Sequence, residues 1–253
     1  MKLFSRHFEG KGKDMIVLHG LFGSSKNWLS AGKRLSEKWN VHLLDLRNHG
    51  DSPHYATHSL LLMAEDIAEY IRTEKLHNPV ILGHSMGGLA AMKTALLFPE
   101  LIDSLIIIDI APKNYSFEHK KEFEALHLNV ENKKSRQEID EEMKKIIPDE
   151  FKRQFLQMNL ERTDTGFRWK LGIHALETST HSMELDFPEH FRFTRKTMFI
   201  FGENSEYNTP DAPELVSRYF PNSEIRVIKG AGHYLHYLNA EEFLSAVMDF
   251  QIE

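Results

Sequence analysis

The sequence predicts an α/β protein with a mostly parallel, doubly wound sheet that is covered by helices on both faces. The first observation behind this prediction is that short apolar runs alternate with helical patterns through most of the chain. The second is the run 105–110, which is so apolar that it must be a central strand. The alternation stops in the middle of the chain. We therefore expect a core made of residues 1–112 and 196–253, with residues 113–195 inserted as a lid.

Each expected element of the core follows from its own local pattern. Helix 59–76 has its apolar residues on one stripe and is stopped by Asn78-Pro79. Further helices are expected from Met86 onward and near 212–220 and 240–250. The expected strands are short apolar runs in the order 2–9, 15–19, 41–46, 79–82, 105–110, 197–201 and 225–228.

The inserted segment is charged and helical in pattern. Its apolar residues fall on two helical stripes: Ile139, Met143, Ile146 and Ile147, then Phe151, Phe155 and Met158. Because it follows the carboxyl end of a strand, it lies over the edge where open sheets bind ligands, and we expect an all-helical lid there. We expect its residues Phe151, Phe155 and Trp169 to contact substrate, together with Phe22 from the core.

The composition excludes several classes of protein. The chain has 253 residues and a net charge of −6, with no basic run interleaved with aromatic residues, so nothing indicates a nucleic-acid partner. It has no cysteine, which excludes disulfides, a thiol nucleophile and thiolate metal sites. No apolar stretch approaches a membrane span, and the N-terminus lacks the apolar core of a signal peptide. We expect a cytoplasmic monomer or small homo-oligomer with no membrane partner.

The segment Gly83-His84-Ser85-Met86-Gly87 has the form Gly-x-Ser-x-Gly, and its setting makes it informative. An apolar run precedes it and a helical pattern follows it, which is the strand–turn–helix context of a catalytic serine. In so tight a turn, a Cβ at either glycine would collide with the neighbouring strand or helix. We therefore expect Ser85 to be a nucleophile held out at the top of the sheet.

A serine hydroxyl needs a base that removes its proton. For this motif the base is a histidine late in the chain, because the catalytic residues run in the order Ser, acid, His. His233 follows the last expected strand in Gly230-Ala231-Gly232-His233, and we expect it to be the base. His236 forms a His-x-x-His pair with His233, but no third ligand is nearby, so we expect no metal.

The acid that orients the histidine has two possible positions. One follows the strand at 197–201, where Ser205 occupies the usual slot and the nearby acids are Glu203, Glu206 and Asp211. The other is Asp109, directly after three isoleucines. A charge beside so apolar a run is costly unless it has a partner, and a catalytic histidine is such a partner. We therefore favour Asp109 and keep the three later acids as the alternative.

The oxyanion that forms during attack needs hydrogen-bond donors that already point toward it. One expected donor is the backbone N–H of Met86, the residue after the nucleophile. The other comes from the loop His19-Gly20-Leu21-Phe22-Gly23, with Leu21 as the first choice and Phe22 as the second. Side chains carry every proton transfer in this scheme, and it implies no cofactor.

These pieces together resemble the α/β-hydrolase fold over essentially the whole chain. Four segments are similar to the small bacterial YbfF-type esterases and their abhydrolase-domain relatives: Val17-Leu18-His19-Gly20-Leu21-Phe22-Gly23-Ser24, Asp45-Leu46-Arg47-Asn48-His49-Gly50-Asp51-Ser52-Pro53-His54, Gly83-His84-Ser85-Met86-Gly87-Gly88 and Ile108-Asp109-Ile110-Ala111-Pro112. The resemblance implies a carboxylesterase that forms an acyl-enzyme on Ser85 and acts on small esters of short to medium acyl chains, with some relatives also cleaving thioesters. It also implies that Asp109 is the acid of the triad.

Two other functions are compatible with the same fold. A carbon–carbon hydrolase or a menaquinone-pathway lyase would need cationic residues to hold a carboxylated substrate, and Arg47, Arg153 and Arg168 are the candidates. A non-enzymatic ligand receptor is the third reading, although such proteins usually lose a member of the triad.

Overall fold

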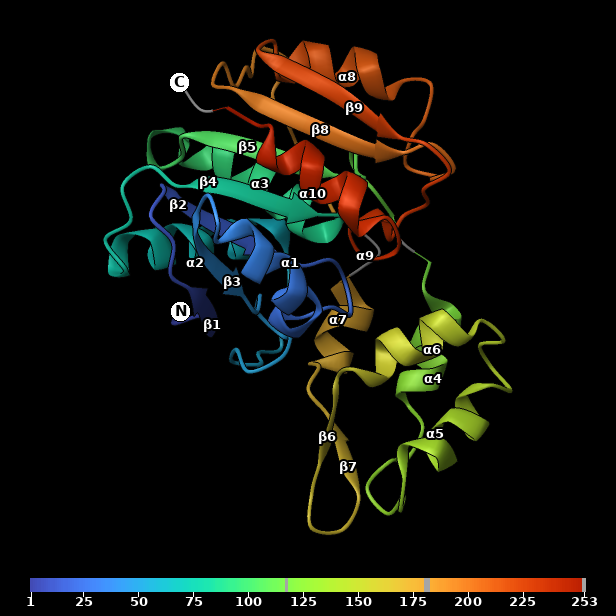
Figure 1. Ribbon diagram of the computed structural model, residues 1–253. Helices are drawn as coiled ribbons and strands as arrows, with labels where there is room; N and C mark the ends of the chain where they lie inside the picture. The colour runs from blue at the N-terminus through green and yellow to red at the C-terminus, as the bar shows by residue number, and fades with distance from the viewer. Residues whose placement is uncertain (117, 180–182, 252–253) are drawn as a thin grey trace.

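The computed structural model describes residues 1–116, 118–179 and 183–251, and its centre is a seven-stranded sheet (Figure 1). The first strand is antiparallel to its neighbour, and all other pairs in this sheet are parallel. The predicted fold class is therefore confirmed. In spatial order the strands are β1 (Ser5–Phe8), β3 (Asn40–Leu44), β2 (Asp14–Leu18), β4 (Val80–His84), β5 (Ser104–Ile108), β8 (Thr197–Gly202) and β9 (Ser223–Ile228).

Helices cover both faces of the sheet, because successive strand residues point to opposite sides. Ile16 and Leu18 of β2 belong to one apolar cluster, whereas Met15 and Val17 belong to the other. The first cluster is completed by α2 (Leu60–Thr73), α3 (Met86–Leu97) and α8 (Ala212–Tyr219). The second is completed by α1 (Leu29–Leu35), α9 (Leu235–Leu238) and α10 (Ala240–Met248). Two short 3₁₀ helices, η1 (Ser25–Trp28) and η2 (Pro99–Leu101), precede α1 and β5.

Strand β5 is central and fully buried, as its apolar sequence predicts. It is shorter than the expected run 105–110, however, and ends at Ile108. The reason is that Asp109 adopts a φ of 54°, in the left-handed region that an extended strand does not allow. This turn directs the chain from the carboxyl end of β5 toward the inserted segment.

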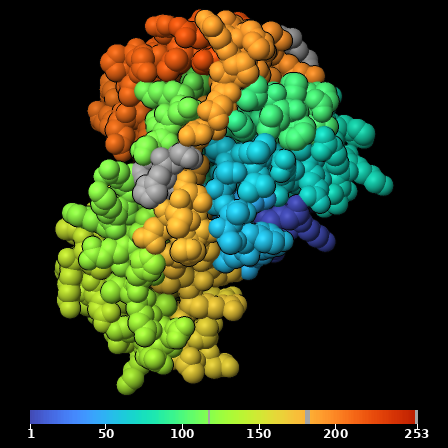
Figure 2. Space-filling view, turned by 180° about the vertical axis from the view of Figure 1, so that it is seen from behind, coloured from blue at the N-terminus to red at the C-terminus, as the bar shows by residue number. Residues whose placement is uncertain are grey.

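The inserted segment forms a separate lobe beside the core, green to yellow-orange in Figure 2. Its helices are α4 (Lys120–Leu126), α5 (Arg136–Met143), α6 (Glu150–Gln157) and α7 (Ile173–Ser179). The expectation of an all-helical lid is wrong, since β6 (Leu160–Arg162) and β7 (Phe167–Trp169) form an antiparallel hairpin between α6 and α7. Gly166 favours this hairpin, because a Cβ there would lie 2.1 Å from the carbonyl oxygen of Glu131.

The lobe has its own apolar core, which includes Ile139 and Met143 of α5 and Leu156 of α6. Phe22 of the core domain is part of the same cluster, so the lobe is packed onto the loop after β2. In the part of the chain that the structure describes, no helix combines the length and apolar character needed to cross a membrane.

Candidate active site

Ser85 stands at a strained turn between β4 and α3, with φ of 52° and ψ of −119°. The glycines around it are required by close backbone contacts. A Cβ on Gly83 would lie 2.3 Å from the carbonyl oxygen of Gly87, and a Cβ on Gly87 would lie 2.5 Å from that of Leu18. Only glycine fits these two positions. The tight turn that the glycines allow holds Ser85 so that its side chain lines a cavity.

Asp109 and His233 form a hydrogen bond of 2.7 Å between Oδ2 and Nδ1. Asp109 comes from the end of β5 and is completely buried, whereas His233 comes from the loop after β9. The other carboxylate oxygen of Asp109 accepts the backbone N–H of Gly202 at 2.9 Å. A buried carboxylate held in this way fixes the orientation of the imidazole and leaves its Nε2 for other partners.

His84 supports His233 from the floor of the site. Its Nε2 donates a hydrogen bond of 2.9 Å to the backbone carbonyl of His233, and the two rings lie 4.6 Å apart. Burial holds the pKa of His84 well below its usual range, so this ring is neutral and its proton serves the hydrogen bond. His84 therefore fixes the backbone that carries His233.

Ser205 is a site residue whose role the sequence interpretation missed. Its hydroxyl donates a short hydrogen bond to Oδ2 of Asp109, the same oxygen that contacts His233. The available signal was its position, because Ser205 occupies the slot after β8 where an acid was considered. Of the alternative acids, Glu203 accepts the N–H of Gly230 at 2.7 Å and Asp211 pairs with Lys113 at 3.0 Å.

The loop after β2 is held by hydrogen bonds on both sides of Leu21 and Phe22. Nε2 of His19 accepts the N–H of Leu46 at 3.0 Å, so its proton is on Nδ1, which donates to the carbonyl of Gly20 at 2.8 Å. From the lid, Nδ2 of Asn159 donates to the carbonyl of Phe22 at 2.7 Å. Leu21, Phe22 and Met86 all line the same cavity as Ser85. The residues expected to supply the oxyanion donors thus line the same cavity as Ser85.

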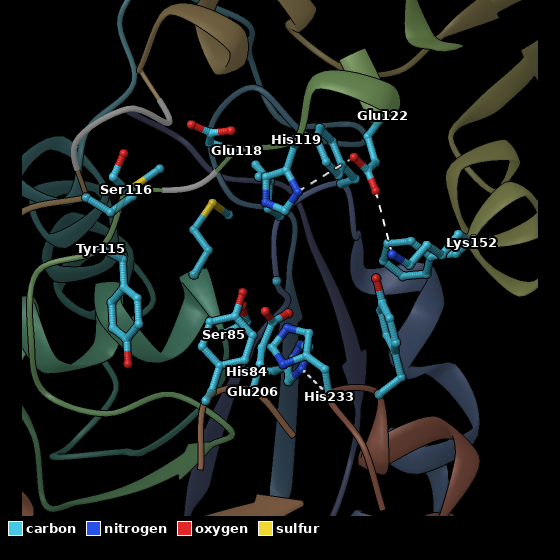
Figure 3. A pocket seen from close by; sticks show the side chains of 18 of the residues that line it. His84, Ser85, Tyr115, Ser116, Glu118, His119, Glu122, Lys152, Glu206 and His233 are labelled. Atoms are coloured by element: carbon cyan, nitrogen blue, oxygen red, sulfur yellow. Dashed lines mark hydrogen bonds and ion pairs between the residues drawn. The ribbon is translucent and has the colours of Figure 1, made fainter. Parts of the chain in front are cut away.

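The cavity over Ser85 has a volume of about 580 Å³ and lies between the sheet edge and the lid. Figure 3 shows Ser85, His84 and His233 grouped at one end. At the other end, Glu122 lies 3.9 Å from His119 and 3.9 Å from Lys152. Five acidic or basic side chains line this cavity, together with His84, His119 and His233: Lys113, Glu118, Glu122, Lys152 and Glu206.

The four predicted substrate-contacting side chains are distributed differently. Phe22 and Phe155 line the cavity over Ser85. Phe151 lines a smaller neighbouring cavity instead. Trp169 lies in the hairpin strand β7, where it packs against the lid's own apolar core, and it is not among the residues that line either cavity. The hairpin, which the helical pattern did not indicate, places Trp169 against this apolar core, and its contact with substrate stays a prediction.

The three arginines considered as carboxylate-binding groups are engaged elsewhere. Arg47 is buried and forms hydrogen bonds of 2.6 and 2.9 Å to Asp66. Arg153 contacts Asp140 at 2.9 Å, and Arg168 contacts Glu161 at 2.5 Å. None of the three is among the described residues that line the cavity over Ser85.

Comparison with known proteins agrees with this geometry. The profile of the alpha/beta hydrolase fold family matches residues 15–240. The chain belongs to this family. It is 32% identical to the sn-1-specific diacylglycerol lipase ABHD11 of Xenopus laevis over 94% of this chain and 80% of that protein.

Two further members of the family bear on the predicted resemblance. Esterase YbfF of Escherichia coli is 28% identical over 92% of this chain and 91% of its own length. A solved structure described as a marine microorganism esterase is 34% identical, covers 99% of both chains and superposes with a TM-score of 0.94. The resemblance to YbfF-type esterases and abhydrolase-domain relatives is therefore confirmed.

Proposed function

We propose that this α/β hydrolase is a serine carboxylesterase that cleaves small esters through an acyl-enzyme on Ser85. The observation that carries the proposal is the 2.7 Å hydrogen bond between Asp109 and His233, with His233 and Ser85 lining one cavity. Nucleophile, base and orienting acid are the three groups that acyl transfer from an ester requires. Three of the similar proteins, two esterases and a lipase, support an ester as the substrate.

The proposed reaction begins when Ser85 Oγ attacks the ester carbonyl carbon and His233 Nε2 takes the hydroxyl proton. The negative charge that develops on the carbonyl oxygen is stabilised by the backbone N–H groups of Met86 and of Leu21 or Phe22. His233 then gives the proton to the leaving alcohol, which departs and leaves the acyl group on Ser85. Water, activated by His233, releases the acid and restores Ser85. Throughout, Asp109 stabilises the imidazolium form of His233.

The test is hydrolysis of p-nitrophenyl esters from acetate to laurate by the wild type, Ser85→Ala, Asp109→Asn and His233→Gln. The wild type should cleave the short esters. Loss of the Asp109 charge should lower kcat about 10⁴-fold, as the analogous change does in serine proteases. If Asp109→Asn keeps most of the activity while Ser85→Ala is inactive, the acid is one of Glu203, Glu206 and Asp211. If Ser85→Ala keeps most of the activity, the proposed mechanism is wrong.

The structure offers less support for the carbon–carbon hydrolase or lyase reading, because its three candidate arginines are paired within the protein and do not line the cavity. The receptor reading is tested by a fluorophosphonate probe, which labels only an activated serine. Labelling of the wild type but not of Ser85→Ala would reject that reading.

A further inference from the structure

A second cavity of about 220 Å³ adjoins the cavity over Ser85. Its walls are four aromatic side chains, a methionine thioether, two side-chain amides and the imidazole of His236. Phe155 of α6 and Tyr234 line both cavities, and their ring centroids lie 5.3 Å apart. These two rings are therefore the partition between the cavities.

The second cavity also lies close to the nucleophile. His236 lines it, and the centroid of the His236 ring is 4.2 Å from that of His84. His84 directly precedes Ser85 and lines the first cavity. A single layer of side chains thus separates the second cavity from the residues around Ser85.

The two cavities differ in charge. Five acidic or basic side chains line the cavity over Ser85 beside its apolar residues, whereas no aspartate, glutamate, lysine or arginine is among the described residues that line the second cavity. In the second cavity, the imidazole of His236 and the phenol of Tyr234 are uncharged at neutral pH. Burial lowers the pKa of His236 to about 3 and raises that of Tyr234 to about 12. The apolar part of a substrate is therefore better accommodated in the second cavity.

We propose that the second cavity is a subsite for an uncharged aromatic or alkyl end of an ester whose carbonyl carbon lies at Ser85. This inference rests on the proposed esterase function. The volume is sufficient, because an apolar cavity of about 150 Å³ holds a benzene molecule and this one has about 220 Å³. Because Phe155 and Tyr234 separate the cavities, their rings must move apart for the group to extend from the charged cavity into the aromatic one.

The test compares methyl acetate with benzyl acetate and methyl phenylacetate, which place a phenyl ring on the alcohol side or on the acyl side. The wild type should prefer at least one aromatic ester, measured as the ratio of kcat/KM to that for methyl acetate. Gln154 lines only the second cavity, so Gln154→Phe should fill it. The preference should then fall about tenfold, the loss expected when a phenyl ring cannot be buried.

The lid provides a matched control. Gln137 is an exposed glutamine of α5 that lines neither cavity, so Gln137→Phe should keep the wild-type ratio. Phe151→Ala enlarges the second cavity and should raise the activity toward naphthylmethyl acetate relative to benzyl acetate. Gln154→Phe should lower the activity toward the aromatic ester, whereas Phe151→Ala should raise the activity toward a larger one. A general loss of folding cannot produce both changes.

The outcomes separate the two proposals. If the wild type cleaves methyl acetate but Gln154→Phe and Phe151→Ala leave both ratios unchanged, the subsite is wrong and the esterase function stands. If the wild type cleaves none of the esters, the proposed function itself is wrong, and the subsite is lost with it.

Discussion

Asn159 is a lid residue that holds the proposed oxyanion loop of the core. It is buried, and its Nδ2 donates both to the carbonyl of Phe22, at 2.7 Å, and to that of Leu156, at 3.1 Å. Phe22 itself has a φ of 60°, a conformation that a bulky residue adopts only when its surroundings hold it there. The lid therefore takes part in holding the backbone of the proposed oxyanion loop.

Replacing Asn159 with aspartate should lower kcat far more than it changes KM. The new carboxylate cannot donate to the Phe22 carbonyl, so the loop relaxes and the oxyanion donors lose their alignment. A misplacement of about 1 Å costs roughly a hundredfold in rate. Steady-state kinetics with p-nitrophenyl acetate, together with the affinity for a trifluoromethyl ketone inhibitor, measure this effect.

The control for this variant is Asn132→Asp, which makes the same change at an exposed lid position. It should leave kcat and inhibitor affinity at the wild-type values. An Asn159→Asp enzyme with raised KM but unchanged kcat would show that Asn159 acts on substrate binding and not on the oxyanion loop.

Individual site residues differ in how far the sequence alone could predict them. Ser85 and His233 stand in short glycine-rich segments, and Asp109 follows a run of isoleucines, so each has a local pattern. The contact of Asn159 has none, because its partner Phe22 is 137 residues away in the chain. Only the packing of the lid on the core brings the two residues together.

The turn between β4 and α3 depends on Gly87, because a Cβ at this position would meet backbone atoms. In Gly87→Ala, the new Cβ would be 2.5 Å from the carbonyl oxygen of Leu18 and 2.6 Å from that of His19. Both are backbone atoms of the sheet and its following loop, so they cannot move aside cheaply. We expect the free energy of unfolding to fall by about 3 kcal/mol.

Gly232→Ala is the matched comparison, since nothing lies within 4 Å of a Cβ built there. Alanine allows the unfolded chain fewer conformations than glycine does, so this variant should be more stable than the wild type by about 0.5 kcal/mol. Urea denaturation of Gly87→Ala, Gly232→Ala and the wild type measures these changes in the free energy of unfolding. Equal stability of the two would mean that close contact at Gly87 does not constrain the turn.

The elements of the core were predictable because the sheet and its helices impose simple periods on the sequence. The helix α2 is an example, with a stripe of apolar residues and a proline after it. The hairpin β6–β7 was not predictable in this way, because its strands have only three residues each and their pairing depends on the lid. Helix α1 was also missed, because it has only seven residues and follows a 3₁₀ turn.

Several histidines of the folded protein are buried, and their protonation limits the stability of the whole molecule at low pH. Burial is the main cause of a lowered pKa in each member of this group: His19, His49, His58, His84 and His236. For His58, burial together with the nearby Arg47 cation and His19 lowers the pKa to about 3. Both ring nitrogens of His58 are buried without a hydrogen-bond partner among the described residues.

These shifts predict that the protein loses stability as the pH falls below about 6.5. In the unfolded chain a histidine binds its proton near pH 6.5, whereas in the folded protein His58 binds it only near pH 3. Between these values the unfolded state holds more protons, so acid favours unfolding. A shift of this size removes about 2 kcal/mol of stability per histidine between pH 7 and pH 5.

The variant His58→Leu tests this prediction, because leucine fills the buried site and binds no proton. Urea denaturation at pH 7, 6 and 5 should show a free energy of unfolding that falls by about 2 kcal/mol less than in the wild type over this range. His190→Leu removes an exposed histidine and should keep the full wild-type loss. If His58→Leu and the wild type lose stability in parallel, the protonation of His58 does not drive the acid unfolding. The other buried histidines would then have to account for any loss that is observed.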